Sequence, residues 1–137
     1  MIESRRTVLG FKSMKSDPAK ILCIDDEEPG LELRKLLLES AGYHVITARS
    51  GAEGIQLFRS QPVDVIILDY WMSGMNGVSV ARELKRLNAA IPIIILSAYA
   101  SLPDEALGVA DVWILKGDAT ESLLASIKDL LETRKAG

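Results

Sequence analysis

Hydrophobic residues in this chain gather in short runs that alternate with segments of mixed polarity. Mainly apolar runs of four to six residues are typical of strands that are buried on both faces of a parallel sheet. Between the runs, apolar residues recur at the three- and four-residue spacing of a helix. The pattern predicts strands over residues 21–24, 43–48, 63–68, 91–96 and 112–115. In the gaps between these strands, and after the last of them, it predicts helices over residues 31–41, 50–61, 78–88, 103–109 and 118–131.

Local signals support the boundaries of the first two predicted helices. Ser50 and Glu53 have the spacing of a capping box, in which a hydroxyl and a carboxylate bind free backbone amides at a helix start. Gly42 follows the first helix as a stop signal. Pro62 follows the second helix, which it cannot continue.

The order of these elements predicts an α/β fold. Five successive β–α units with mainly apolar strands imply one parallel sheet that carries helices on both faces. Right-handed crossovers leave few arrangements, and the flavodoxin-like doubly wound (βα)5 sheet with strand order 2-1-3-4-5 is the commonest of them. The length of 137 residues fits one such domain. We assign residues 19–137 to it and expect residues 1–18 to form a flexible tail.

Composition and charge exclude several classes of function. The net charge of -3 offers no basic face to phosphates, so nucleic acid is not an expected partner. The single cysteine, Cys23, cannot form an internal disulfide. No apolar stretch approaches the ~20 residues that span a bilayer, and the first residues lack the apolar region of a signal peptide. We therefore predict a cytoplasmic protein without membrane insertion.

Polar residues whose side chains can take part in a reaction stand directly after the predicted strands. They are Asp25 and Asp26 after the first strand, Asp69 after the third, Ser97 after the fourth and Lys116 after the fifth. Ligands of open parallel sheets bind beyond the carboxyl ends of the strands. Because these strands are neighbours in the order 2-1-3-4-5, the five side chains should converge in one cleft.

This set of residues suits magnesium-dependent phosphoryl transfer. Three neighbouring carboxylates repel one another unless a cation is present, and Mg²⁺ prefers oxygen ligands from carboxylates, waters and phosphate. A lysine and a hydroxyl stabilise charge on phosphoryl oxygens, and a carboxylate can form an aspartyl phosphate. Each residue alone has an ordinary explanation as a turn, cap or solvated group. Their joint occurrence at four strand ends favours a site.

The same residues lie within motifs that resemble those of response-regulator receiver domains, the CheY-like family. The motifs read ILCIDDE (21–27), VIILD (65–69), MSGMNG (72–77), IILSA (94–98) and WILK (113–116). Their order and spacing are more specific than any single motif, and the resemblance covers about residues 19–135. It implies a stand-alone phosphoacceptor of a two-component or phosphorelay signalling system. Such a protein is not an enzyme beyond its own phosphorylation and dephosphorylation.

The resemblance implies a role for each matching acidic residue. Asp69 matches the phosphoacceptor. For Mg²⁺, Asp26 matches the direct ligand and Asp25 the ligand that acts through water, and Asp69 and the backbone carbonyl of Trp71 contribute further ligands. The implied phosphodonor is a histidine kinase or a phosphotransfer protein, and the output protein is not specified. We expect a monomer or a weak dimer.

Three further residues match the positions that respond to phosphorylation in this family. Ser97 matches the hydroxyl residue that follows the phosphoryl group after transfer, and Lys116 matches the lysine that pairs with that group. Trp113 matches the aromatic switch, whose ring turns inward when the hydroxyl residue moves. The resemblance therefore implies that phosphorylation shifts the population from an inactive to an active conformation.

Three features depart from the family pattern. Ser73 and Gly117 stand where the family usually has proline. The second of these prolines is typically cis, so Gly117 should loosen the loop after the last strand. The segment between Ser97 and Lys116 is short by about one helical turn, which predicts a trimmed or irregular helix. These departures leave open a phosphate-independent, receiver-like protein-binding module.

Two other classes of protein fit the residues less well. Phosphatases and dehalogenases with an aspartate nucleophile usually have a second acid two residues later as a general acid, and Trp71 stands there. A nucleotide-binding Rossmann domain has a glycine-rich turn after the first strand. Residues 25–28 are all acidic in this chain and would repel a pyrophosphate.

Overall fold

A computed structural model of the chain describes residues 17–73, 75–101 and 103–136. Five parallel strands form its central sheet, in the order β3-β2-β4-β7-β8. The strands are β2 Lys20–Ile24, β3 His44–Ala48, β4 Val65–Asp69, β7 Ile93–Ser97 and β8 Val112–Leu115. Along the sequence this is the arrangement 2-1-3-4-5, so the predicted flavodoxin-like fold is confirmed. Residues 1–16, which make up most of the predicted tail, lie outside the described residues.

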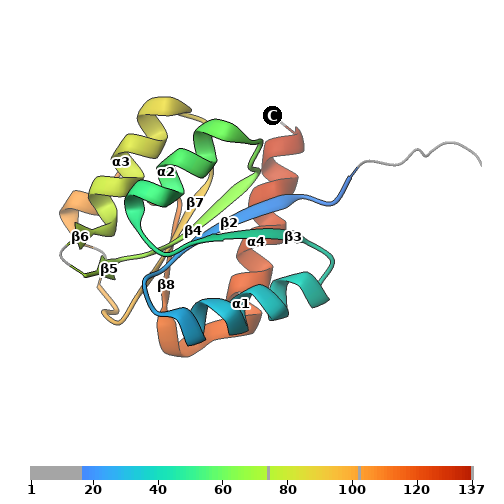
Figure 1. The fold of residues 1–137 in the computed structure, drawn as a ribbon, viewed down its shortest axis with the longest axis horizontal. Coiled ribbons are helices and arrows are strands. Elements are labelled where there is room, and N and C mark those ends of the chain that lie inside the picture. The colour runs from blue at the N-terminus through green and yellow to red at the C-terminus, as the bar shows by residue number, and fades with distance from the viewer. Residues whose placement is uncertain (1–16, 74, 102, 137) are drawn as a thin grey trace, which may run out of the picture.

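Helices cover both faces of the sheet. They are α1 Glu28–Ser40, α2 Gly51–Ser60, α3 Gly77–Leu87 and α4 Ala119–Ala136. Figure 1 shows α2 and α3 on one side of the sheet and α1 and α4 on the other. Buried side chains accordingly form two hydrophobic cores, one on each face. Within the described segments, no helix has the length and apolar character that crossing a membrane requires.

Alternate residues of each central strand enter alternate cores. Ile21 and Cys23 of β2 pack in the core of α1 and α4, and Leu22 and Ile24 pack in the core of α2 and α3. All four side chains are at most 1% exposed. Burial of a side chain of this size contributes roughly 1.5–3 kcal/mol, which explains the nearly continuous apolar runs. Cys23 is fully buried in this core, and its burial raises the pKa of the thiol to about 12.

The predicted helix boundaries have the expected local causes. The Ser50 hydroxyl accepts a hydrogen bond from the Glu53 amide at 3.1 Å, and the Glu53 carboxylate accepts one from the Arg49 amide at 2.8 Å. Gly42, after α1, has a φ of 99°, a left-handed conformation that glycine adopts without steric cost. The capping box and the glycine stop are therefore confirmed.

The structure differs from the predicted elements in the loops near the site. Residues after β4 form a hairpin of β5 Trp71–Met72 and β6 Met75–Asn76, which are too short to produce a hydrophobic period. Between β7 and β8, the predicted helix over 103–109 is reduced to the 3-10 helix η1 Asp104–Ala106. Gly108 follows it with a φ of 85°, which is incompatible with a continuing helix. The expected trimming of this segment is confirmed.

The loop after β8 is ordered into a second 3-10 helix, η2 Lys116–Asp118. No peptide bond among the described residues is cis. Gly117 is the middle residue of this short helical turn, at the position where the family pattern has a proline.

Candidate functional site

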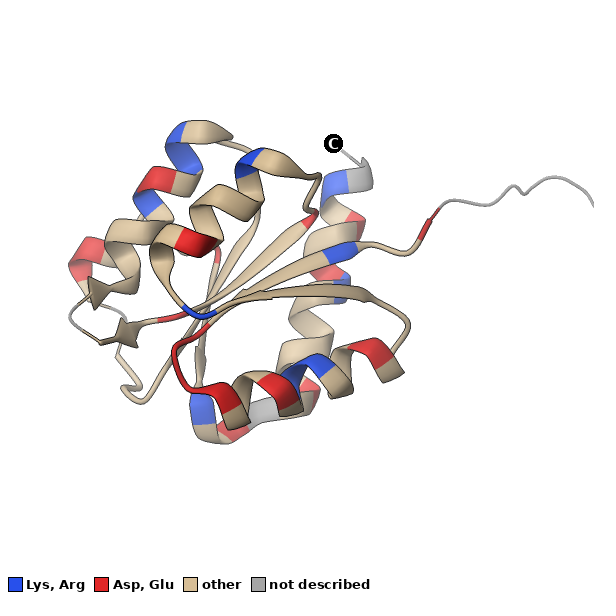
Figure 2. Cartoon of the chain, viewed as in Figure 1, with Lys and Arg blue, Asp and Glu red and all other residues tan. Residues whose placement is uncertain are grey.

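The carboxyl ends of β2, β4 and β8 bring four predicted site residues together. Asp25 and Asp26 directly follow β2, Asp69 is the last residue of β4, and Lys116 follows β8. Figure 2 shows acidic residues in the loop after β2 and at the end of β4, at the same edge of the sheet. One carboxylate oxygen from each aspartate lies within 4.8 Å of the other two. This convergence follows from the strand order.

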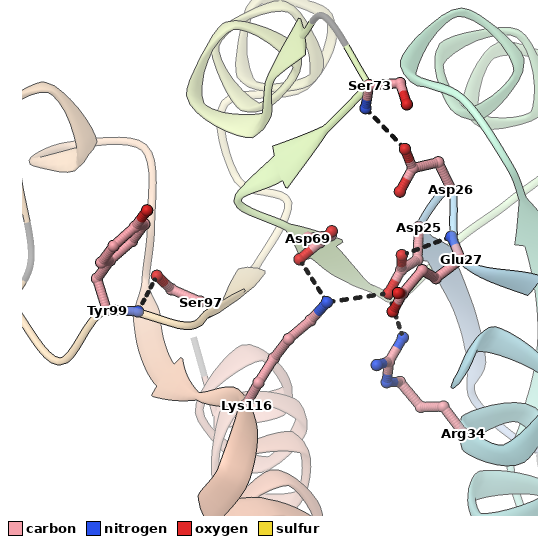
Figure 3. Close-up of polar contacts among 9 residues, drawn as sticks. All are labelled: Asp25, Asp26, Glu27, Arg34, Asp69, Ser73, Ser97, Tyr99 and Lys116. Atoms are coloured by element: carbon pink, nitrogen blue, oxygen red, sulfur yellow. Dashed lines mark hydrogen bonds and ion pairs between the residues drawn. The ribbon is translucent and has the colours of Figure 1, made fainter. Parts of the chain in front are cut away.

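Asp25 is buried and its two oxygens have separate partners. The carboxylate is 1% exposed. Its Oδ1 accepts a hydrogen bond from the Glu27 amide at 3.0 Å. Its Oδ2 lies 3.3 Å from Nη1 of Arg34 on α1 and 3.7 Å from Nζ of Lys116. Two cations from different elements therefore compensate this buried charge (Figure 3).

Asp69 is nearly buried and forms an ion pair with Lys116. The Nζ atom of Lys116 lies 3.0 Å from Oδ1 of Asp69. Burial raises the pKa of Asp69 to about 6, and the charges of Asp25 and Asp26 add to that effect, whereas Lys116 opposes it. Burial also acts to lower the pKa of Lys116, but the hydrogen bond and charge of Asp69 outweigh it and raise that pKa. Asp69 thus lies in a site with excess negative charge.

Asp26 lies nearer the surface and is held by the backbone. Its Oδ2 accepts a hydrogen bond from the amide of Ser73 at 2.7 Å, and this bond is the main reason that the pKa of Asp26 is lowered. Proline has no amide hydrogen to donate. The departure at Ser73 therefore supplies a contact that a proline at this position could not make.

Ser97 lies at the end of β7, with its hydroxyl engaged away from the carboxylates (Figure 3). Its Oγ accepts a hydrogen bond from the Tyr99 amide at 2.9 Å. The carbonyl of Tyr99 in turn accepts one from the indole N–H of Trp113 at 3.0 Å. The Trp113 ring packs edge-on against Tyr70, with ring centroids 5.2 Å apart. The two predicted switch residues are therefore linked through Tyr99.

A cavity of about 400 Å³ opens beside Asp69. Trp71 and Tyr99 flank it with side chains that are 62% and 64% exposed. The cavity therefore has space for a ligand next to the carboxylate of Asp69. Its lining residues are Asp26, Glu27, Asp69, Tyr70, Trp71, Ser73, Ala98, Tyr99 and Lys116.

A family model described as the response regulator receiver domain matches residues 21–128. This span includes all the strand ends that form the site. The chain belongs to the response-regulator receiver family.

Known proteins of similar sequence place such a receiver domain within longer chains. The transcriptional regulatory protein GlrR of Escherichia coli K12 is 35% identical over 122 residues, which cover 87% of this chain and 28% of GlrR. This chain thus spans little more than a quarter of that relative. Receiver domains are signalling phosphoacceptors, and two-component signal transduction is the process to which this family belongs.

Solved receiver structures agree with this fold over most of the chain. The response regulator TrrA of Thermotoga maritima, solved in complex with Mg²⁺ and BeF, has 34% identity and a TM-score of 0.77, covering 82% of this chain and 99% of TrrA. A receiver domain from Methanospirillum hungatei has 29% identity and a TM-score of 0.81, covering 88% of this chain and 100% of that domain.

The donor set of this receiver domain fits Mg²⁺. Receiver domains bind Mg²⁺ at the acidic phosphorylation site, and the clustered ligands here are carboxylate oxygens from three aspartates. Hard cations of this kind prefer oxygen ligands. The mutual repulsion that helps to raise the pKa of Asp69 is the effect that a bound cation relieves.

Sequence reasoning missed the contacts that cross between elements in this receiver domain. Glu105 of η1 accepts hydrogen bonds from Nδ2 of Asn76 at 2.6 Å and from the Tyr70 hydroxyl at 3.4 Å. These bonds join the trimmed segment to the residue that follows Asp69. Arg34 was also missed, because a charged residue on a helix is usually solvated. No local pattern identifies either residue.

Without metal, Asp69 should make the fold less stable as the pH rises from about 4 to about 6. The pKa of Asp69 is about 6 in the folded protein and 3.8 ordinarily, so the folded state binds this proton more tightly than the unfolded state. Its stabilising effect is complete below pH 3.8 and is lost as the pH rises through about 6. Asp69→Asn removes this loss and should raise the free energy of unfolding at pH 7.5 by about 1–3 kcal/mol.

Urea denaturation with EDTA present, at pH 4.5 and 7.5, measures this difference. The variant should gain stability over wild type as the pH rises. A variant that is no more stable than wild type at pH 7.5 contradicts the raised pKa.

Proposed function

We propose that this receiver domain takes a phosphoryl group onto Asp69 in a Mg²⁺-dependent reaction and thereby changes its affinity for a partner protein. The observation that carries the proposal is the pairing of Asp69 with Lys116 at 3.0 Å, inside a cluster whose three carboxylates approach within 4.8 Å. A nucleophilic carboxylate, a positively charged group beside it and oxygen ligands for a cation are the parts that phosphoryl transfer uses.

In the proposed reaction, an oxygen of the Asp69 carboxylate attacks the phosphorus of the donor. An oxygen–phosphorus bond forms, the bond from phosphorus to the leaving group breaks, and its electron pair goes to the leaving group. The pKa of about 6 leaves Asp69 mainly ionised at neutral pH, as a nucleophile must be. Lys116 already lies beside the attacking carboxylate and can donate a hydrogen bond to a phosphoryl oxygen.

Asp25, Asp26 and Asp69 are the side chains that we propose to hold Mg²⁺, with the carbonyl of Trp71 as a further ligand. Asp25 is the one that we expect to act through water. A bound Mg²⁺ supplies positive charge that stabilises the phosphoryl oxygens. Trp71 lines the cavity beside these aspartates, which is compatible with that role.

Phosphorylation is proposed to act on the rest of the domain through Ser97. The Ser97 hydroxyl can donate its own hydrogen to a phosphoryl oxygen, and a turn toward Asp69 would alter the hydrogen bond that its oxygen accepts from the Tyr99 amide. Because the Tyr99 carbonyl accepts the hydrogen bond of the Trp113 indole, movement of this loop changes the environment of Trp113. Phosphorylation would then shift the population between two arrangements of Ser97, Tyr99 and Trp113.

The proposed phosphodonor is a histidine kinase or a phosphotransfer protein. The related response regulator TrrA, which is 34% identical to this chain, has been solved in complex with the histidine kinase ThkA. The leaving group would then be the imidazole of a phosphohistidine.

Intact-mass measurement with acetyl phosphate, with and without Mg²⁺, tests the proposed function. We expect a gain of one phosphoryl group that requires Mg²⁺ and that peptide mapping places on Asp69. No gain under either condition would reject the phosphoacceptor function and favour the phosphate-independent binding module. The departures at Ser73 and Gly117 would then be features of a domain that binds its partner without phosphate.

A further inference from the structure

Arg34 is a second cation of the carboxylate cluster, beside the Lys116 that the family pattern identifies. Its Nη1 atom donates to Oδ2 of Asp25 at 3.3 Å. The Arg34 side chain is 15% exposed and the Asp25 carboxylate is 1% exposed, so solvent screens this pair weakly. The contact joins α1 to the end of β2.

The two cations reach the cluster from different elements. Figure 3 shows Arg34 reaching Asp25 from α1 and Lys116 reaching Asp25 and Asp69 from the end of β8. Lys116 lies closer to Asp69 than to Asp25, at 3.0 Å and 3.7 Å respectively. Arg34 is therefore the cation nearest to Asp25, and Lys116 serves mainly Asp69.

We infer that Arg34 is a resident counter-cation that stabilises the metal-free cluster and weakens its binding of divalent cations. A buried carboxylate that loses its partner is strongly destabilising. The same guanidinium charge repels a dication bound by neighbouring carboxylates. One residue thus acts with opposite sign on two measurable properties. It lowers the affinity for Mg²⁺, so that a higher Mg²⁺ concentration is needed to fill the site. It also raises the stability of the metal-free domain.

The inference rests on the proposed Mg²⁺ site and concerns a positioning residue, because Arg34 acts through Asp25. Its charge can be removed while its length is largely kept. Arg34→Met and Arg34→Gln both remove the charge, and Gln keeps a donor group if Met proves too destabilising. Arg34→Lys keeps the charge. Lys35→Met is the matched control, because Lys35 on the same helix pairs with Glu39 rather than with Asp25.

Calorimetric titration of each metal-free protein with MgCl₂ at pH 8, and urea denaturation in EDTA, give the two readings. We expect Arg34→Met and Arg34→Gln to bind Mg²⁺ about tenfold more tightly than wild type, from the loss of one unit charge near a dication. Both variants should unfold at lower urea concentration in EDTA. Arg34→Lys and Lys35→Met should stay within about twofold of wild type in Mg²⁺ affinity, since both preserve a cation beside Asp25.

The outcomes separate this inference from the proposed function. If wild type binds Mg²⁺ and the two neutral variants bind it equally or more weakly, the counter-cation role is wrong and Arg34 is a structural ion pair only. If wild type binds no Mg²⁺, or if Asp26→Asn leaves the binding unchanged, the proposed metal site itself fails. Tighter binding together with lower apo stability supports both.

Discussion

Asp69→Asn is expected to abolish incorporation of a phosphoryl group from acetyl phosphate. The amide of asparagine is a far weaker nucleophile than a carboxylate and forms no acyl phosphate under these conditions. The effect should be complete within detection, whereas loss of a supporting group such as Lys116 reduces the rate by weakening charge stabilisation. Intact mass spectrometry of wild type and variant, with Mg²⁺ present, measures the difference.

This loss is expected in a folded protein, because Asp69→Asn should stabilise the metal-free domain at neutral pH by removing a buried charge. Circular dichroism of the same samples measures whether the variant is folded. Asp104→Asn is the matched control, since it removes the same charge from the exposed start of η1 and should be phosphorylated like wild type. A full phosphoryl gain in Asp69→Asn would show that another residue is the phosphoacceptor.

Gly77→Ala is expected to destabilise the domain by about 3 kcal/mol, the upper end of the range typical of strain forced into a packed core. A Cβ atom at Gly77 would clash with the carbonyl oxygen of Asp69 and would lie 3.1 Å from Cα of Tyr70. These are backbone atoms, so no side chain can rotate away. The Gly77 amide also donates to the Tyr70 carbonyl at 2.6 Å, which holds α3 against the strand that carries Asp69.

The same substitution should also slow phosphorylation of whatever protein remains folded, because relief of the clash displaces the backbone of Asp69. Gly30→Ala is the matched control on α1, where a Cβ meets nothing within 4 Å. There alanine should raise stability by about 0.5–1 kcal/mol, since glycine is unfavourable inside a helix. Thermal and urea unfolding compare the three proteins. Equal stability of the two variants would contradict the close approach at Gly77.

The approach at Gly77 illustrates a limit of reading the chain locally. A glycine at the start of a predicted helix has several ordinary explanations, and its contact with the backbone of Asp69 depends on how α3 packs beside β4. The trimmed segment before β8 is an intermediate case. Its shortness was visible in the spacing between Ser97 and Lys116, but its attachment to Tyr70 and Asn76 through Glu105 was not.

The sequence by itself determined the fold and the four charged residues that meet at the candidate site. Strands that are buried on both faces must be apolar throughout, so each one stands out, and the parallel order then sends their carboxyl ends to one edge of the sheet. Asp25, Asp26, Asp69 and Lys116 follow from that rule alone. Ser97, which the same rule placed with them, lies at its strand end but has its hydroxyl bound to the Tyr99 amide.

Only the tertiary structure decided the electrostatics of the site. The raised pKa of Asp69 comes from burial and from charges in the loop after another strand, and the lowered pKa of Asp26 comes mainly from the amide of Ser73. The counter-cation Arg34 reaches Asp25 from a neighbouring element. These contacts depend on distances of a few ångströms between side chains of different elements. Some of those elements are far apart in the chain, and others are neighbours that packing brings face to face. Electrostatic energies change steeply over those distances, and a local pattern of polar and apolar residues does not contain them.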